Sequence, residues 1–370
     1  MSQQVQIDYQ QIANQCQSVC EVADTRLKEL DDLIAKLQET SSSIIDERAL
    51  ELKKIIEKEK QNLINQISNL RKKAQKDAEL GTITTNNHDV RYAHRNDTIF
   101  AAEKLQRMAD ILASERLIEF QSLLTALLGE NINESFQKMR EQSRGAISID
   151  SRTQTLLDGI SDEMLRQFTY LAYLGDNTLT GDKLLQAGKS LMDRTVNQTY
   201  EQRYEQECAK IRAELEASRV TPENINKVLN EKEGTVKEKL IAMRQSATAE
   251  IVGEKVRQKS LKIIMDAIKQ RGFIVDKKNI KIKRDTNEVI MVALKASGER
   301  AEFRIFLDGK FIYDFHGYEG QACQKDIEPF MHDLEEIYGI HVTKQTEIWS
   351  NPDKISTMKY QALNTNKNKK

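Results

Sequence analysis

The first eighty residues contain neither glycine nor proline, and this absence most constrains what the chain can fold into. Without a helix breaker, long uninterrupted helices are favoured. Apolar residues recur at spacings of three and four, which place them on one face of a helix. They are Ile12, Cys16, Val19, Ala23, Leu27, Leu30, Ile34 and Leu37, followed by Ile56, Leu63, Ile67, Leu70 and Ala74. This set, the N-terminal seam, has a heptad spacing with one irregular step, and it predicts a coiled coil that another helix must cover.

A run of serines divides this stretch in two. Residues 41–43 are all serine, and Asp46 follows Ser43 by three positions. A hydroxyl followed by a carboxylate at this distance is an N-cap pattern, because both groups can bind the first free amides of a helix. We therefore expect helices over residues 3–38 and 44–81, each about 50 Å long at about 1.5 Å per residue. The periodicity leaves open whether they form an antiparallel hairpin or one rod with a polar break.

Composition argues against several classes of protein. Charged residues make up 31% of the 370 residues and aromatic residues only 6%, which suits amphipathic helices better than a large enzyme core. Lysine and arginine (56) nearly cancel aspartate and glutamate (57), so no general attraction to nucleic acid or anionic membranes is expected. The chain begins without signal-peptide features, and no apolar run approaches the ~20 residues of a membrane span. Four scattered cysteines favour a cytoplasmic location.

The middle of the chain reads as further helices. We expect a loop over residues 81–96 and then helices over 98–128, 131–144, 164–175 and 179–219. Thr221-Pro222-Glu223 is a strong helix start, with a hydroxyl cap, a proline at the first position and an acid in the first turn. Gly234 should interrupt that helix, and a last long helix should end at Gln270. These segments predict a helical bundle over residues 96–258.

From Gly272 the period changes from 3.6 to 2, which indicates strands. Four are expected, over residues 279–283, 289–294, 301–307 and 310–316. Asp308-Gly309 predicts a two-residue hairpin turn in which both residues have positive φ. A helix should begin between residues 322 and 326, with Pro329 in or near its first turn, and should end at Gly339.

The expected fold is therefore mostly α. A long coiled-coil helical hairpin (residues 1–80) and the helical bundle precede a small α+β domain with an antiparallel β-meander (residues 259–345). Residues 346–370 are polar and are expected to form a disordered tail.

Residues 303–340 resemble a family of short bacterial proteins of unknown function. The resemblance lies in a strand, an Asp-Gly turn, a second strand, a glycine-bracketed loop and a helix that starts at a cysteine. The matching residues are Asp308, Gly309, Phe315, Gly317, Gly320, Cys323, Leu334 and Gly339. The resemblance implies a bacterial origin and this local fold, but no activity. The remaining helices are similar only to coiled-coil proteins in general.

Two arrangements of cysteines could carry chemistry. Cys16 and Cys20 lie four apart on one helix face, but no further ligand is near in sequence, so we expect packed thiols and no metal. Cys323 is expected at a helix N-terminus, where the helix dipole lowers a thiol pKa. His316, at the end of a strand, could pair with it to make a nucleophile. A packing role is the simpler interpretation, because the loop has no protease signature.

A basic cluster marks the first predicted strand. It consists of Lys277, Lys278, Lys281, Lys283 and Arg284. With the lysines of the tail, this cluster could bind nucleic-acid phosphates. Lysines also protect an edge strand from unwanted pairing. Since no aromatic residues alternate with the cluster, we favour the edge-strand interpretation.

No phosphate-binding glycine loop, dinucleotide-binding turn or zinc-protease helix occurs in the sequence. We therefore expect a non-enzymatic coiled-coil scaffold or adaptor without a cofactor, in a bacterial cytosolic multiprotein assembly. It would bind partner proteins and self-associate through the N-terminal seam. The alternatives are a nucleic-acid-binding protein that uses residues 277–284 and a thiol-dependent enzyme at Cys323.

Overall fold

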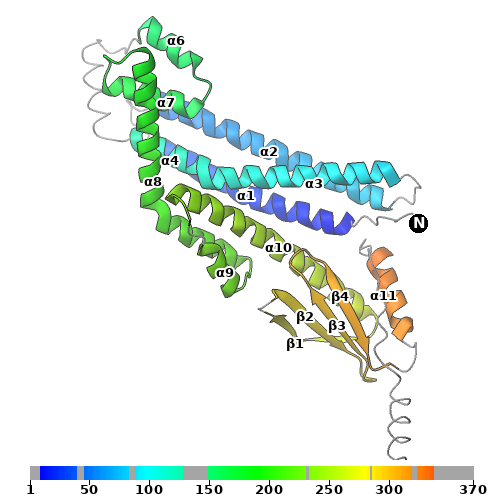
Figure 1. Ribbon diagram of the computed structural model, residues 1–370. Coiled ribbons are helices and arrows are strands. Elements are labelled where there is room, and N and C mark those ends of the chain that lie inside the picture. Colours follow the sequence, from blue (N-terminus) through cyan, green and yellow to red (C-terminus); the bar gives the residue numbers. More distant parts are fainter. Residues whose placement is uncertain are drawn as a thin grey trace, which may run out of the picture.

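The computed structural model describes residues 9–39, 46–82, 88–127, 149–230, 233–283, 286–318 and 323–336. Over these residues the protein is mostly helical, with a four-stranded antiparallel sheet near the C-terminal end. Figure 1 shows α1 (Tyr9–Glu39), α2 (Asp46–Thr82) and α3 (His88–Ile111) side by side at the N-terminal end, and α10 (Val236–Gln270), which leads from the helical body to the sheet. Among the described helices, none is long and apolar enough to cross a lipid bilayer.

The first two helices form an antiparallel hairpin. They are α1 (Tyr9–Glu39) and α2 (Asp46–Thr82). Lys60 of α2 contacts Asp31 at 2.5 Å, and Arg71, further along α2, contacts the earlier Asp24 at 2.7 Å. This reversed order selects the hairpin over the rod. Coiled-coil geometry stays a prediction.

The third helix begins inside the segment that we predicted to be a loop. It is α3 (His88–Ile111), so the prediction is wrong for residues 88–96. The helix packs on both α1 and α2, Lys73 of α2 pairs with Asp97, and Thr98 is fully buried. Tertiary packing thus overrides a polar sequence with weak helix propensity. The helix continues through a π-helical turn, η1 (Leu112–Arg116), into α4 (Leu117–Leu127). The helix expected over 131–144 lies outside the described residues.

Four helices follow, and three of them begin at a side chain that caps the helix. They are α6 (Ser151–Gly159), α7 (Glu163–Gly175), α8 (Gly181–Ala217) and α9 (Pro222–Leu229). Asp162 caps α7 through its carboxylate. Thr221 caps α9 with Pro222 at the first position, which confirms the predicted helix start. Helix α6, which Asp150 caps, was not predicted from the sequence.

The long helix α10 (Val236–Gln270) joins the two parts of the molecule. It starts with a capping box formed by Thr235 and Glu238. The apolar side chains of α10 between Leu240 and Val252 pack in the core of the helical body. Further along the helix, Ile264 and Ile268 pack in the core formed with the sheet. The expected boundary between residues 258 and 259 therefore lies inside a continuous helix, at the point where its contacts change.

The strands form the expected meander. They are β1 (Ile274–Lys283), β2 (Glu288–Leu294), β3 (Arg300–Ile305) and β4 (Phe311–His316), paired in this order with all neighbours antiparallel. β1 begins five residues before the predicted strand, and its register shifts between Val275 and Ile280. One face of the sheet packs against α10 and α11 (Gln324–Glu336), where Phe303 of β3 meets Phe330.

Two local predictions in this part need correction. In the β3–β4 hairpin only Gly309 has positive φ, at 80°. The amide of Gly309 donates to the carbonyl of Phe306, and the amide of Phe306 donates to the carbonyl of Lys310, so this is a three-residue loop with a bulge at the glycine. Pro329 is the sixth residue of α11, beyond its first turn. The predicted tail, residues 346–370, lies outside the described residues.

Candidate functional site

The sheet turns one face to α10 and α11 and leaves the other exposed. On the covered face the alternate residues of β2 and β3 are buried: Val289, Met291, Ala293, Ala301, Phe303 and Ile305. The intervening side chains point the other way, because successive residues in a strand alternate. Apart from Glu288 at the start of β2, which is buried, these side chains are exposed or half-buried. With the corresponding residues of β4 they form what we call the outer face: Ile290, Val292, Leu294, Arg300, Glu302, Arg304, Ile312, Asp314 and His316.

The outer face exposes aliphatic side chains between charged ones. Ile312 is 56% exposed and Leu294 is 42% exposed. Ile274, which pairs with Leu294 across the β1–β2 ladder, is exposed as well. Ile290 and Val292 are half-buried and complete an aliphatic column along β2. Exposed apolar groups bordered by polar residues are typical of interaction sites.

The charges on the outer face also follow a pattern. Along β3 they alternate: Glu302 pairs with Arg300 at 2.6 Å and lies 3.6 Å from the Nε of Arg304. Glu302 lies directly opposite Asp314 of β4, and Asp314 pairs with His316 at 3.2 Å. Glu302 and Asp314 thus form an acidic row across β3 and β4, and this row lies between Arg300 and Arg304 of β3. The outer face therefore presents both signs of charge in a fixed order.

The predicted basic cluster lies on β1, which is an edge of the sheet. The side chains of Lys277, Lys278, Lys281 and Lys283 are all exposed, and Arg284 lies outside the described residues. Lys278 pairs with Asp276 of its own strand at 3.0 Å. Lysines on a bulged edge strand fit the protective interpretation. Exposure by itself leaves phosphate binding as an untested alternative.

The structure does not bring Cys323 and His316 together. Cys323 is half-buried just before α11, which packs on the covered face of the sheet. His316 lies on the outer face, with its Nε2 3.2 Å from the carboxylate of Asp314, while its neighbour Phe315 points to the covered face. A Cys-His pair would need both side chains on one side of the sheet. The hypothesis of a thiol enzyme has no geometric support among the described residues.

The N-terminal seam is covered by the chain's own helices. Ile12, Cys16, Val19, Leu30, Leu37, Ile56, Leu63, Ile67 and Leu70 are buried, and Leu27 and Ile34 are half-buried against the same core. The helices α2, α3 and α10 all pack on α1. Self-association through this seam stays a prediction, but it would require these helices to separate first.

The thiols of Cys16 and Cys20 lie at the wall of a small cavity. The cavity measures about 270 Å³ and is also lined by Arg71 and Glu21. Burial raises the pKa of Cys16 to about 12, helped by the adjacent Cys20. A protonated thiol is a poor metal ligand. Among the described residues no group of three or more histidine, cysteine or acidic side chains could hold a metal ion.

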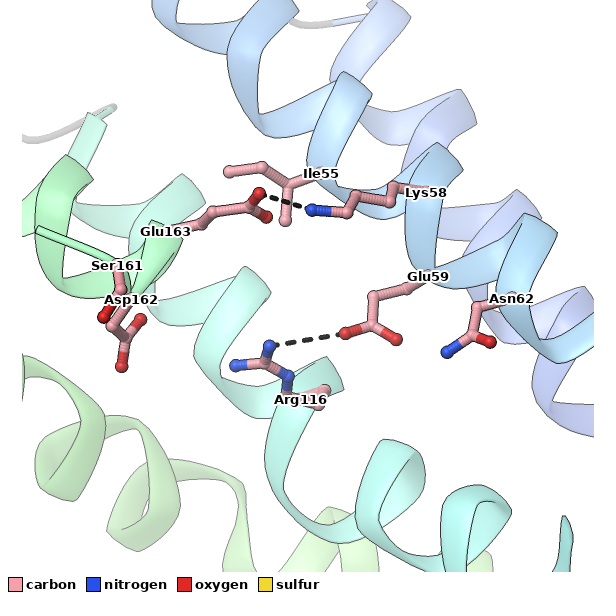
Figure 2. Close-up of a pocket in the computed structure, with 8 residues that line it drawn as sticks. All are labelled: Ile55, Lys58, Glu59, Asn62, Arg116, Ser161, Asp162 and Glu163. Atoms are coloured by element: carbon pink, nitrogen blue, oxygen red, sulfur yellow. Dashed lines mark hydrogen bonds and ion pairs between the residues drawn. The ribbon is translucent and has the colours of Figure 1, made fainter. Parts of the chain in front are cut away.

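A larger crevice of about 490 Å³ opens between α2, the π-helical turn and the start of α7 (Figure 2). Its charged side chains already pair with one another. Lys58 binds Glu163 at 2.6 Å, and Arg116 of the π-helical turn binds Glu59 at 3.3 Å. The remaining lining residues are Ile55, Asn62, Ser161 and Asp162. The lining contains no histidine or cysteine, and its one lysine, Lys58, is held by Glu163, so no base in this lining is arranged to activate Ser161.

A buried ionic cluster joins four helices inside the helical body. Arg26 of α1, only 1% exposed, donates to both carboxylate oxygens of Glu214 of α8, at 3.1 and 2.6 Å. Arg244 of α10 bridges Glu214 at 2.9 Å and Glu207 at 3.4 Å. Burial works to raise the pKa of Glu214, but the bonds from Arg26 and the charge of Arg244 lower it overall. The cluster therefore holds α1, α8 and α10 in one register.

Asp110 of α3 belongs to the same cluster. The hydroxyl of Thr248 of α10 donates to its carboxylate at 2.5 Å. Burial raises the pKa of Asp110 to about 6, although this bond and the charges of Arg26 and Arg244 oppose the shift. None of these residues was predicted from the sequence, because a charged residue is expected on a solvated helix face.

The chain matches no known family, no curated protein and no solved structure. The resemblance of residues 303–340 to short bacterial proteins therefore stays a prediction.

Proposed function

We propose that this protein is a non-enzymatic scaffold or adaptor that binds partner proteins through the outer face of its sheet, in a bacterial cytosolic assembly. The observation that carries the proposal is the outer face itself. It combines exposed aliphatic side chains with fixed charges on a rigid sheet, whose other face is packed against α10 and α11. Interfaces are built from such a mixture of apolar contact area and polar rim.

The lack of catalytic geometry in the described residues supports the proposal. The crevice holds ion pairs, the thiols of Cys16 and Cys20 are buried, and His316 points away from the side of Cys323. None of these places combines a nucleophile, a base and a place for substrate.

Nucleic-acid binding is the second candidate. Four exposed lysines on one edge strand favour it. It ranks second because the acidic row of Glu302 and Asp314 lies on the face next to this edge and would repel phosphates.

The test of the adaptor function is capture of partners from the native source by variants of the outer face. Ile312→Asp places a charge in the outer face, where Ile312 is 56% exposed. The matched control is Leu50→Asp on α2, where the leucine is 51% exposed. We expect Ile312→Asp to lose protein partners that both the wild type and Leu50→Asp retain. Identical sets of captured proteins for all three chains would contradict the proposal.

A further inference from the structure

The outer face carries its aliphatic and charged side chains in an order that fits a second copy of itself. Two adjacent columns run along the strands. The β2 column is aliphatic after the buried Glu288 at its start, and consists of Ile290, Val292 and Leu294. The β3 column alternates in charge: Arg300, Glu302 and Arg304, held by ion pairs within the column. The register places the two columns side by side, with Val292 opposite Glu302.

Twofold symmetry turns this order into complementarity. In a twofold interface, if residue i of one copy contacts residue j of the other, then j also contacts i. When the β3 columns of two copies run in opposite directions, staggered by one position on the face, Glu302 of each copy lies over Arg300 of the other. The same stagger places Val292 of each copy over Leu294 of its partner, and Asp314 over His316. This arrangement therefore matches charged and aliphatic groups together.

We propose that a second copy of this chain covers the outer face, with the two sheets stacked face to face. This inference rests on the proposed function, since it names the occupant of the same docking surface. Face-to-face sheets lie about 10 Å apart, so that side chains from both inner layers interdigitate. In such a dimer Val292 and Leu294 leave water, and Glu302 gains an arginine from the partner copy in addition to its own.

The charges of this face disfavour a polyanion as occupant. Glu302 and Asp314 are directly opposed and lie at the centre of the face, where a phosphate backbone would have to pass. Arg300 and Arg304 are both already paired with Glu302. A self-complementary surface needs both signs of charge, as observed here, whereas a nucleic-acid surface needs one.

The size of the sheet indicates a weak dimer. Four strands about 4.8 Å apart and about 20 Å long give a flat area of about 400 Å² per copy. That is below the ~800 Å² per partner of a standard stable interface. We therefore expect a reversible dimer that forms in the micromolar range.

The decisive experiment uses charge reversal with the full-length chain. One variant is Glu302→Arg, which makes the β3 column wholly basic. The other is the double variant Arg300→Glu with Arg304→Glu, which makes it wholly acidic. Sedimentation velocity would be recorded from about 1 to about 200 µM, the range in which a weak dimer dissociates. Circular dichroism would check that both variants are folded.

We expect the wild type to show a sedimentation coefficient that rises with concentration. Each variant alone should remain monomeric, because like charges then face one another, and an equimolar mixture should associate again at least as well as the wild type. The matched control is Arg107→Glu on α3, which reverses an arginine whose side chain is 75% exposed. It should dimerise like the wild type.

Three results would overturn the inference. The first is a mixture of the two variants that stays monomeric. The second is a monomeric wild type that retards DNA until Lys281 and Lys283 are made glutamine. The third is a photo-crosslinker at position 312 that reacts with residues 337–370 of its own chain. If the wild type is monomeric while Ile312→Asp still loses captured partners, the dimer is wrong and the adaptor function stands.

Discussion

Neutralising Asp110 should stabilise the fold at neutral pH, and by an amount that depends on pH. Burial of the carboxylate raises its pKa from the ordinary 3.8 to about 6, despite the Thr248 hydroxyl and two nearby arginines. The folded state therefore prefers the protonated form. At about 1.4 kcal/mol per pKa unit, the shift corresponds to about 3 kcal/mol.

The sign follows from the direction of the shift. Because the pKa is higher in the folded state, protonated Asp110 favours folding at low pH, and this contribution is lost as the pH rises from about 4 to about 6. An asparagine side chain at this position would be neutral at every pH, and its oxygen can still accept the Thr248 hydroxyl. We expect Asp110→Asn to match the wild type near pH 4 and to exceed it by up to about 3 kcal/mol above pH 7.

The measurement is urea denaturation of both proteins at several pH values between 4 and 8. The control is Asp158→Asn, which removes an exposed carboxylate of α6 and should change the unfolding free energy by less than about 0.5 kcal/mol at each pH. Glu214 titrates in both proteins, so its contribution cancels in the difference. A difference that does not vary with pH, or an asparagine variant that is less stable at pH 7.5, would refute the reasoning.

Two further substitutions test the packing of the helical body. A Cβ at Gly188 of α8 would lie 2.3 Å from the Oγ1 and 2.6 Å from the Cα of Thr169 of α7, so Gly188→Ala should cost about 1–3 kcal/mol or more. Gly159→Ala, where a Cβ meets nothing within 4 Å, is the matched control in thermal unfolding, and equal losses would contradict the close contact. Arg26→Met should cost about 3 kcal/mol or more, because it leaves Glu214 buried with one arginine in place of two. A methionine variant as stable as the wild type in urea denaturation would show that apolar packing replaces the ion pair without loss.

Much of the fold follows from local sequence signals. The Thr221-Pro222 start, the helix at 164–175 and the hairpin helices were predicted to within a few residues, because caps, glycines and apolar periodicity act over a few positions. The π-helical turn at Leu112–Arg116 and the start of α3 at His88 were not. The π-helical turn packs against α10, and the Tyr200 hydroxyl of α8 donates to the carbonyl of Ser114 at 2.7 Å, whereas α3 packs against α1 and α2. No local pattern records contacts between segments so far apart in the sequence.

The candidate site shows the same division. The alternation of side chains in the predicted strands was correct. The outer face could therefore have been predicted as the residues that point away from the side of Met291 and Phe303. The pairing of Cys323 with His316 failed for a different reason. Sequence spacing cannot tell which side of a sheet a following helix will cover, and here α11 covers the side that His316 does not face.

The sequence by itself determined that residues 9–39 form a helix with an apolar stripe, but only the tertiary structure decided where the stripe runs. The irregular step in the N-terminal seam disappears when Arg26 and Leu33 replace Leu27 and Ile34 as core positions. The spacing from Ile12 to Leu37 then alternates strictly between four and three, and both replacements are buried. An arginine is assigned to the surface when only its own helix is known, because burying an unpaired charge is costly. Glu214, 188 residues away, supplies the partner that makes the buried position stable, and that pairing exists only in the folded chain.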